Sequence, residues 1–127
     1  MRATDTKVLI RLVTGDDPQQ TRSAEEFIAR GAWVSVVVLA DTMWVLKDIY
    51  GFGPADIATA VASLLENEHI ILQDADAVAA ALDLLRSRPA LGFADCLILE
   101  LARKAGHLPL ATFDRKLGKV EGTELLR

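Results

Sequence analysis

The sequence predicts an α/β fold: a three-layer α/β/α sandwich around a central, mainly parallel sheet. Short apolar runs alternate with longer stretches of helical periodicity, which is the arrangement that builds a parallel sheet covered by helices on both faces. The length of 127 residues suits one compact domain, and no linker, repeat or low-complexity segment divides it. We therefore expect residues 1–127 to form a single domain.

The chain begins with a short strand over Arg2–Asp5, and apolar side chains from Val8 to Val13 then predict a brief helix. Asp16 or Asp17 caps a second helix. The β-branched run WVSVVVL, Trp33–Leu39, predicts a central strand buried on both faces. It is the strongest strand signal in the sequence.

The later segments continue the alternation of helix and strand. In order, we expect a helix ending at Tyr50, a helix over Ala55–Leu65, a strand over Ile70–Leu72, a helix from Asp74 to Arg88, a helix over Phe93–Ala105, the strand LPLAT, a helical turn from Asp114, and an edge strand near Leu125. Parallel strands linked by helices have their carboxyl ends at one edge of the sheet, where α/β domains bind their ligands.

Composition excludes several classes of protein. Hydrophobic residues make up 51% and charged residues 25% of the chain, as in an ordinary folded protein, and the formal net charge of −4 disfavours a basic nucleic-acid wrapper. The single Cys96 cannot form an intramolecular disulfide. The N-terminal apolar run is too short and interrupted for a signal peptide or membrane span, so we expect a cytoplasmic protein with no membrane partner.

Four aspartates are expected at the carboxyl edge of the sheet. Asp5 ends the first strand, Asp41 lies two residues past the strongest strand, Asp95 begins a late helix, and Asp114 follows LPLAT. Converging carboxylates bind one or two Mg²⁺ or Mn²⁺ ions, and such ions promote hydrolysis of a phosphodiester. The alternative at each position is an ordinary helix cap or strand-end residue.

Four segments, in this order, carry a resemblance to a known family: DTKVLIRL, VVVLADTMWVL, FADCLILELARKAG and ATFDRKL. Together they resemble the PIN-domain ribonucleases, and most closely the VapC-type toxins of bacterial toxin–antitoxin pairs. The resemblance implies a Mg²⁺- or Mn²⁺-dependent endoribonuclease. Its catalytic and metal-binding cluster would consist of Asp5, Asp41, Asp95 and Asp114. The implied partners are an RNA substrate, a cognate antitoxin and a second copy in a homodimer.

Several polar residues near these acids are candidates for contact with RNA. Thr6 and Thr112 could bind a phosphate oxygen, or else satisfy local backbone groups. Arg11, Arg115 and Lys116 could contact phosphates, or else be solvated surface charges.

Trp44 and Cys96 are two further candidate residues. Trp44, together with Leu46 and Tyr50, is assigned to core packing, with stacking on a base as the alternative. Cys96 beside Asp95 is in an acidic setting that disfavours a catalytic thiolate.

Three positions depart from the family pattern. Lys7 stands where relatives usually have Asn, Asp41 where they have Glu, and Gly92 where many have Asp. A cation at position 7 could pair with an aspartate and compete with the metal. A catalytically weakened PIN-fold binding protein is therefore the alternative function. A phosphoacceptor receiver domain is disfavoured, because Asp5 is a single acid where receivers need a pair.

Overall fold

The computed structural model describes residues 1–127 as helices joined by short strands. Six α-helices are present, at Thr6–Thr14 (α1), Pro18–Ala29 (α2), Val36–Asp48 (α3), Pro54–Glu66 (α4), Ala75–Ser87 (α5) and Phe93–Ala105 (α6). Two 3₁₀ turns lie at Pro89–Leu91 (η1) and Leu117–Lys119 (η2). The strands are Arg2–Ala3 (β1), Ala32–Val34 (β2), Ile70–Leu72 (β3), Leu110–Thr112 (β4) and Thr123–Leu125 (β5).

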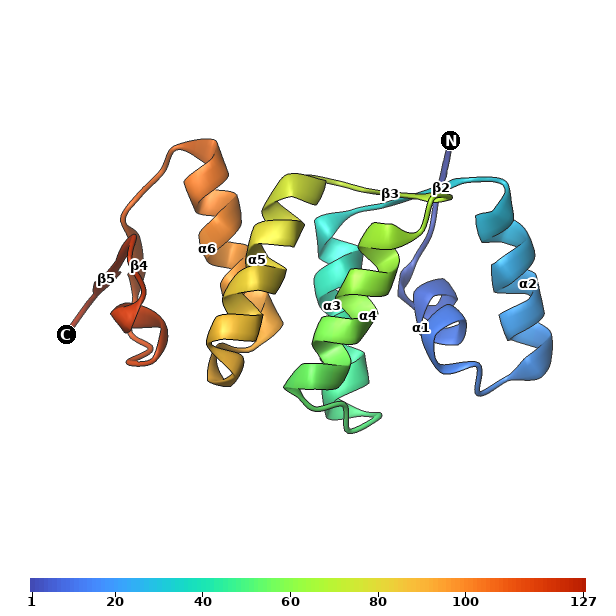
Figure 1. Cartoon of the computed structure of the whole chain (residues 1–127), viewed down its shortest axis with the longest axis horizontal. Helices are drawn as coiled ribbons and strands as arrows, with labels where there is room; N and C mark the ends of the chain where they lie inside the picture. Colours follow the sequence, from blue (N-terminus) through green and yellow to red (C-terminus); the bar gives the residue numbers. More distant parts are fainter.

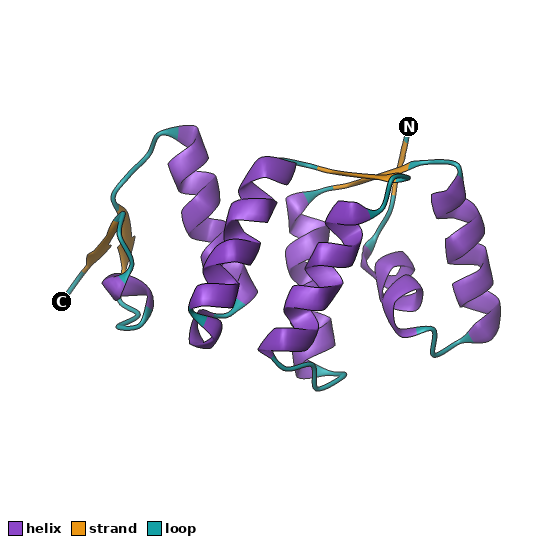
Figure 2. Cartoon of the chain, in the orientation of Figure 1, coloured by secondary structure: helices purple, strands orange, loops and turns teal.

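The strands are parallel, as expected, and the chain has the α/β architecture that the sequence predicts. They form two sheets: a three-stranded sheet in the order β1-β2-β3 and a two-stranded sheet of β4 and β5. Figure 1 shows the two sheets at different ends of the molecule, with α5 and α6 beside the second one. The secondary-structure colouring of Figure 2 makes the small share of strand visible.

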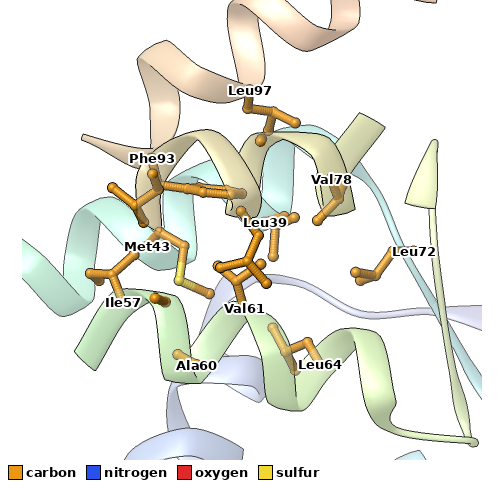
Figure 3. Packing of buried hydrophobic residues seen from close by; sticks show 14 of the residues in the cluster. Leu39, Met43, Ile57, Ala60, Val61, Leu64, Leu72, Val78, Phe93 and Leu97 are labelled. Atoms are coloured by element: carbon orange, nitrogen blue, oxygen red, sulfur yellow. The ribbon is translucent and has the colours of Figure 1, made fainter. Parts of the chain in front are cut away.

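The hydrophobic core lies between α1, α3, α4, α5 and α6, on one face of the three-stranded sheet. Figure 3 shows Leu39 and Met43 of α3 meeting Val61 of α4 and Phe93 of α6. Val34 and Leu72 point from β2 and β3 into the same core. The α5–α6 pair is the most extensively packed pair of elements, so the helices and not the sheets hold the fold together.

The prediction of a strand over Trp33–Leu39 is wrong beyond Val34. Helix α3 begins at Val36, and the hydroxyl of Ser35 caps it by accepting a 3.1 Å hydrogen bond from the Val38 amide. A good N-cap and burial of Leu39 in the core outweigh the β propensity of the VVV run. Asp41 therefore lies within a helix and not after a strand.

Helix ends explain most of the other boundaries. Asp17, and not Asp16, caps α2, since its carboxylate accepts a 3.0 Å hydrogen bond from the Gln20 amide. Asp74 occupies the cap position of α5 in the left-handed region (φ 51°) without a capping bond, because its carboxylate pairs with Lys104 at 2.7 Å. None of the helices combines the length and the apolar character needed to cross a lipid bilayer.

Candidate active site

The first two candidate aspartates meet through a threonine. Asp5 is the N-cap of α1 and accepts a long, 3.4 Å hydrogen bond from the Val8 amide. The adjacent Thr6 donates a 2.6 Å hydrogen bond from its hydroxyl to the Asp41 carboxylate on α3. The two acids, 36 positions apart, are thus brought to neighbouring places on the surface by one side chain. We call Asp5, Thr6 and Asp41 the α1–α3 group.

The other two aspartates form a second group. Asp95 lies half-buried in the first turn of α6, and Asp114 follows β4. Burial raises the pKa of Asp95, and the negative charge of Asp114 raises it further, whereas the cation Lys47 on α3 lowers it. Burial and a nearby negative charge both disfavour the ionised form of a carboxyl group. Carboxyl groups in such surroundings occur often at functional sites. We call Asp95 and Asp114 the α6–β4 group.

Asp95 lines a pocket of about 360 Å³. Its walls are mainly apolar and come from α3, α4, η1 and the start of α6. Trp44 and Lys47 of α3 line it together with Asp95, so an aromatic ring, a cation and a carboxylate face one hollow.

The assignment of Trp44 to core packing is wrong, because the side chain is 57% exposed. Leu46, by contrast, is fully buried. Helical spacing places these two residues on different faces of α3, and only Leu46 enters the core. Trp44 is therefore free to contact a ligand in the pocket.

The structure separates the candidate RNA-contacting residues. Thr6 belongs to the α1–α3 group, and Thr112 accepts a 3.0 Å hydrogen bond from the Asp114 amide, which fixes the turn after β4. Arg115 and Lys116 follow on the exposed side of that turn and make no ion pair.

Arg11 is held in a different network. Its guanidinium bonds Asp16 at 3.1 Å, Gln20 at 2.6 Å and Tyr50 at 3.3 Å, linking α1, the start of α2 and the end of α3. Hydrogen bonds from Tyr50 and Thr14, together with the charge of Arg11, lower the pKa of Asp16. These contacts connect α1 to the start of α2 and to Tyr50 just past the end of α3.

Lys7 is exposed and pairs with none of the aspartates. Cys96 is fully buried, and burial, followed by the charge of Asp95, raises the pKa of its thiol to about 11. The expectation that this thiol is not a nucleophile is confirmed, because a protonated, buried thiol is inert.

The four aspartates have the right ligand atoms for a divalent cation, but within one chain they do not lie close enough together to hold one. Carboxylate oxygens are the ligands that Mg²⁺ and Mn²⁺ prefer. However, no three acidic, histidine or cysteine side chains lie close enough to hold one ion. The four aspartates form two groups, one on α1 and α3 and one on α6 and β4.

Sequence reasoning overlooked Lys47, whose charge reaches Asp95. The sequence spacing could have indicated it, because Trp44 and Lys47 are three residues apart and therefore share a helix face. What the sequence lacked was the packing of α6 against that face.

The structure is thus an α/β domain with parallel strands, and its four candidate aspartates lie on α3, at the starts of α1 and α6, and after β4. The chain belongs to the PIN domain family, whose model matches residues 3–122. PIN domains are generally nucleases, and this supports a hydrolase here. Neither the curated proteins nor the solved structures gave a match.

Proposed function

We propose that the chain is an endoribonuclease that hydrolyses RNA phosphodiester bonds with Mg²⁺ or Mn²⁺ at Asp5, Asp41, Asp95 and Asp114. The observation that carries this proposal is the α6–β4 group. Two carboxylates from distant segments are held near each other, and one of them is half-buried beside an exposed tryptophan. Like charges are kept together at a cost in stability, which favours a functional reason for their proximity.

The surroundings of Asp95 suit an RNA strand. An exposed aromatic ring can stack on an unpaired base, and Lys47 can face a phosphate. Single-stranded regions are the natural substrate, because bases in a duplex are not free to stack on a side chain. Arg115 and Lys116 beside Asp114 would add phosphate contacts, whereas the bonding of Arg11 supports a structural role for that residue.

We further propose that the nuclease is the cytoplasmic toxin of a type II toxin–antitoxin pair and acts as a homodimer. The order of the four PIN-like segments supports this assignment. An antitoxin with a basic residue near its C-terminus would neutralise the exposed carboxylates of Asp5 and Asp41.

The test is RNA cleavage by the chain purified without its antitoxin. Cleavage should require Mg²⁺ or Mn²⁺, stop with chelator, and fall at least about a hundredfold in Asp5→Asn and in Asp95→Asn. Asp83→Asn, which changes an exposed aspartate on α5, is the matched control and should keep full activity. Cleavage that persists in chelator, or in both site variants, would exclude this mechanism.

The separation of the acids supports a second candidate, a PIN-fold binding protein with weakened catalysis. In that case calorimetry would detect no binding of Mn²⁺ at millimolar concentration. The double variant Lys7→Asn with Asp41→Glu would restore it. Wild-type cleavage of RNA at micromolar Mn²⁺ would rule this candidate out.

A further inference from the structure

The pocket lined by Asp95 has the size and the walls of a ligand-binding site. Its volume of about 360 Å³ falls in the usual range for such sites, roughly 300–1,000 Å³. Apart from the indole of Trp44, Lys47 and Asp95 are the only lining residues whose side chains carry a charge or a hydrogen-bonding group. The pocket therefore suits a flat, largely apolar group with a charged group beside it.

The walls come from two helix connections that lie together. Phe52 belongs to the connection between α3 and α4, and residues 89–92 belong to the connection between α5 and α6. Figure 1 shows both connections at the same end of the helices. Figure 3 shows Met43, Ile57 and Phe93, three buried lining residues, close to one another. Because these three side chains are held in the core, the pocket has fixed walls on that side.

Trp44 is the most exposed aromatic side chain at this pocket. It is 57% exposed, whereas Phe93 is 4% exposed. An apolar ring in water costs free energy that is recovered when another ring covers it, and aromatic rings stack readily on flat partners. A planar ligand that enters the pocket beside Trp44 covers this ring.

Free cations lie next to the pocket. Lys47 lines it, and the turn of residues 84–94, which supplies much of the lining, carries Arg86 and Arg88 and no acid. All three cations are exposed and form no ion pair. The chain as a whole has a net charge of −4, so these free cations do not follow from its composition. They favour an anionic ligand, and phosphate is an anion that arginine binds well.

A second pocket, between α1 and α4, differs in charge. Its volume is about 400 Å³, and its only charged lining residue is Asp56. The Asp56 carboxylate accepts a 3.1 Å hydrogen bond from the Gly53 amide and so stabilises the start of α4. Of these two pockets, only the one beside Asp95 combines an exposed aromatic ring with a free cation.

Single-stranded RNA has both of the groups that the pocket beside Asp95 accommodates. An unpaired base is a flat heterocycle that stacks on aromatic side chains, and the phosphates on either side of it bind arginine and lysine. An apolar side chain of a peptide would fill the pocket but leave the cations unused. Since Asp95 is one of the proposed catalytic acids, a base in this pocket belongs to a nucleotide next to the bond that is cut.

We propose that the pocket beside Asp95 receives one unpaired purine base of the RNA, stacked on Trp44, and that Arg86 and Arg88 bind the phosphate on the side away from Asp95. The walls lack neutral polar side chains that could read the edge of a base, so affinity follows the apolar area of the ring, which is larger for a purine. This role of the pocket rests on the proposed nuclease function, and it makes cleavage depend on the size of the base.

The first test is binding of short RNA in chelator, which prevents metal-dependent cleavage. Trp33 and Trp44 are the only tryptophans, so in Trp33→Phe the fluorescence reports on Trp44 alone. The probes are single strands of six adenylates, six uridylates or six abasic nucleotides. The adenylate strand should quench Trp44 and bind about 5- to 150-fold more tightly than the abasic strand, which is the effect of stacking one base. The uridylate strand should bind with intermediate affinity.

Ala90→Leu fills the pocket at an exposed position of η1 and should remove most of this difference. Its affinity for the adenylate strand should fall at least about fivefold, whereas its affinity for the abasic strand, which depends on the cations, should not change. The unchanged abasic binding also shows that the variant is folded. Ala79→Leu, the matched control, adds the same volume at an exposed position on α5 outside both pockets and should behave as wild type.

Two results would overturn the base-binding role of the pocket. One is equal affinity for the adenylate and abasic strands, since binding would then involve phosphates alone. The other is an unchanged affinity of Ala90→Leu for the adenylate strand, which is the result expected if the pocket takes an apolar peptide side chain instead.

The second test concerns Arg86 and Arg88. In the double variant Arg86→Gln with Arg88→Gln, the slope of log affinity against log salt concentration should fall in magnitude by about 0.7, the contribution of one neutralised phosphate of a single strand. The decrease should be the same for adenylate and abasic strands, because it does not involve the base. Arg22→Gln with Arg30→Gln, which changes two exposed arginines on and just past α2, is the matched control. An unchanged slope in the first double variant would contradict the role of these two arginines.

Binding and cleavage can fail separately. If the nuclease function is wrong, base-dependent binding is seen in chelator, but no RNA is cut when Mn²⁺ is added. If the base-binding role is wrong, Mn²⁺ supports cleavage, but the adenylate, uridylate and abasic strands bind alike in chelator.

Discussion

The hydroxyl of Thr6 donates a 2.6 Å hydrogen bond to the carboxylate of Asp41, and this bond joins the start of α1 to the middle of α3. It holds one oxygen of Asp41 and leaves the other free. Asp41 has no other side-chain partner, so Thr6 determines where its carboxylate points. A short acidic side chain at position 41 is thereby given a fixed direction.

Replacing Thr6 by Val should lower RNA cleavage about 10- to 100-fold, the usual cost of losing a group that orients a metal-binding carboxylate. Thr6→Ser keeps the hydroxyl and should retain most of the activity. Thr59→Val is the matched control, since the Thr59 hydroxyl bonds only a carbonyl of its own helix. The measurement is initial rate against Mn²⁺ concentration, and an unchanged curve for Thr6→Val would contradict the role.

Replacing Asp95 by Asn should raise the melting temperature by a few degrees at pH 7 while removing cleavage. The pKa of Asp95 is raised in the folded chain, so the folded state binds this proton more tightly than the unfolded state does. The stabilising contribution is complete below the ordinary pKa of 3.8 and is lost as pH rises through the folded value. The ionised carboxylate therefore costs stability at neutral pH, and Asn removes that cost.

The pH dependence of the melting temperature tests this prediction. The difference in melting temperature between Asp95→Asn and wild type should be largest at neutral pH and narrow as pH falls toward 3.8, where the wild-type carboxyl is also neutral. Asp83→Asn on exposed α5 should show no such trend. A lower melting temperature for Asp95→Asn at pH 7 would contradict the direction of the pKa shift.

Replacing Trp44 by Ala should weaken RNA binding by about 1–3 kcal/mol, or roughly 5- to 150-fold, if the ring stacks on a base. Because the side chain is 57% exposed, the fold should be little affected. Trp44→Phe should keep part of the affinity. Ile49→Ala, at a 70% exposed position just past the end of α3, is the control for loss of exposed apolar surface. Equal affinities of wild type and Trp44→Ala for single-stranded RNA would exclude stacking.

Replacing Arg11 by Met should lower the melting temperature by a few degrees without changing the KM for RNA. The guanidinium bonds Asp16, Gln20 and Tyr50, and its loss removes the hydrogen bonds that join α1 to the start of α2 and to the segment after α3. Arg22→Met, at an exposed position on α2, is the control and should change neither quantity. A raised KM with an unchanged melting temperature would instead assign Arg11 to phosphate binding.

Local signals in the sequence predicted the helices well. Asp17 with Pro18, the Asp114 turn and the terminating Gly106 all act over a few residues, so their effect can be read without the rest of the fold. The run after Trp33 failed because β propensity depends on the neighbours that a strand acquires. The Ser35 cap and the burial of Leu39 stabilise this segment as a helix, so Asp41 lies within a helix and not after a strand.

By itself, the sequence determined the α/β class, the parallel strands and the PIN family, because alternating periodicity and four ordered motifs are properties of the chain alone. Only the tertiary structure decided which acids lie together. Thr6, next to Asp5, bonds Asp41, whereas Asp95 lies near enough to Asp114 to feel its charge. Both relationships depend on how elements distant in the sequence pack in space. The strands fall into two sheets for the same reason, since strand pairing is a long-range interaction that no local sequence signal specifies.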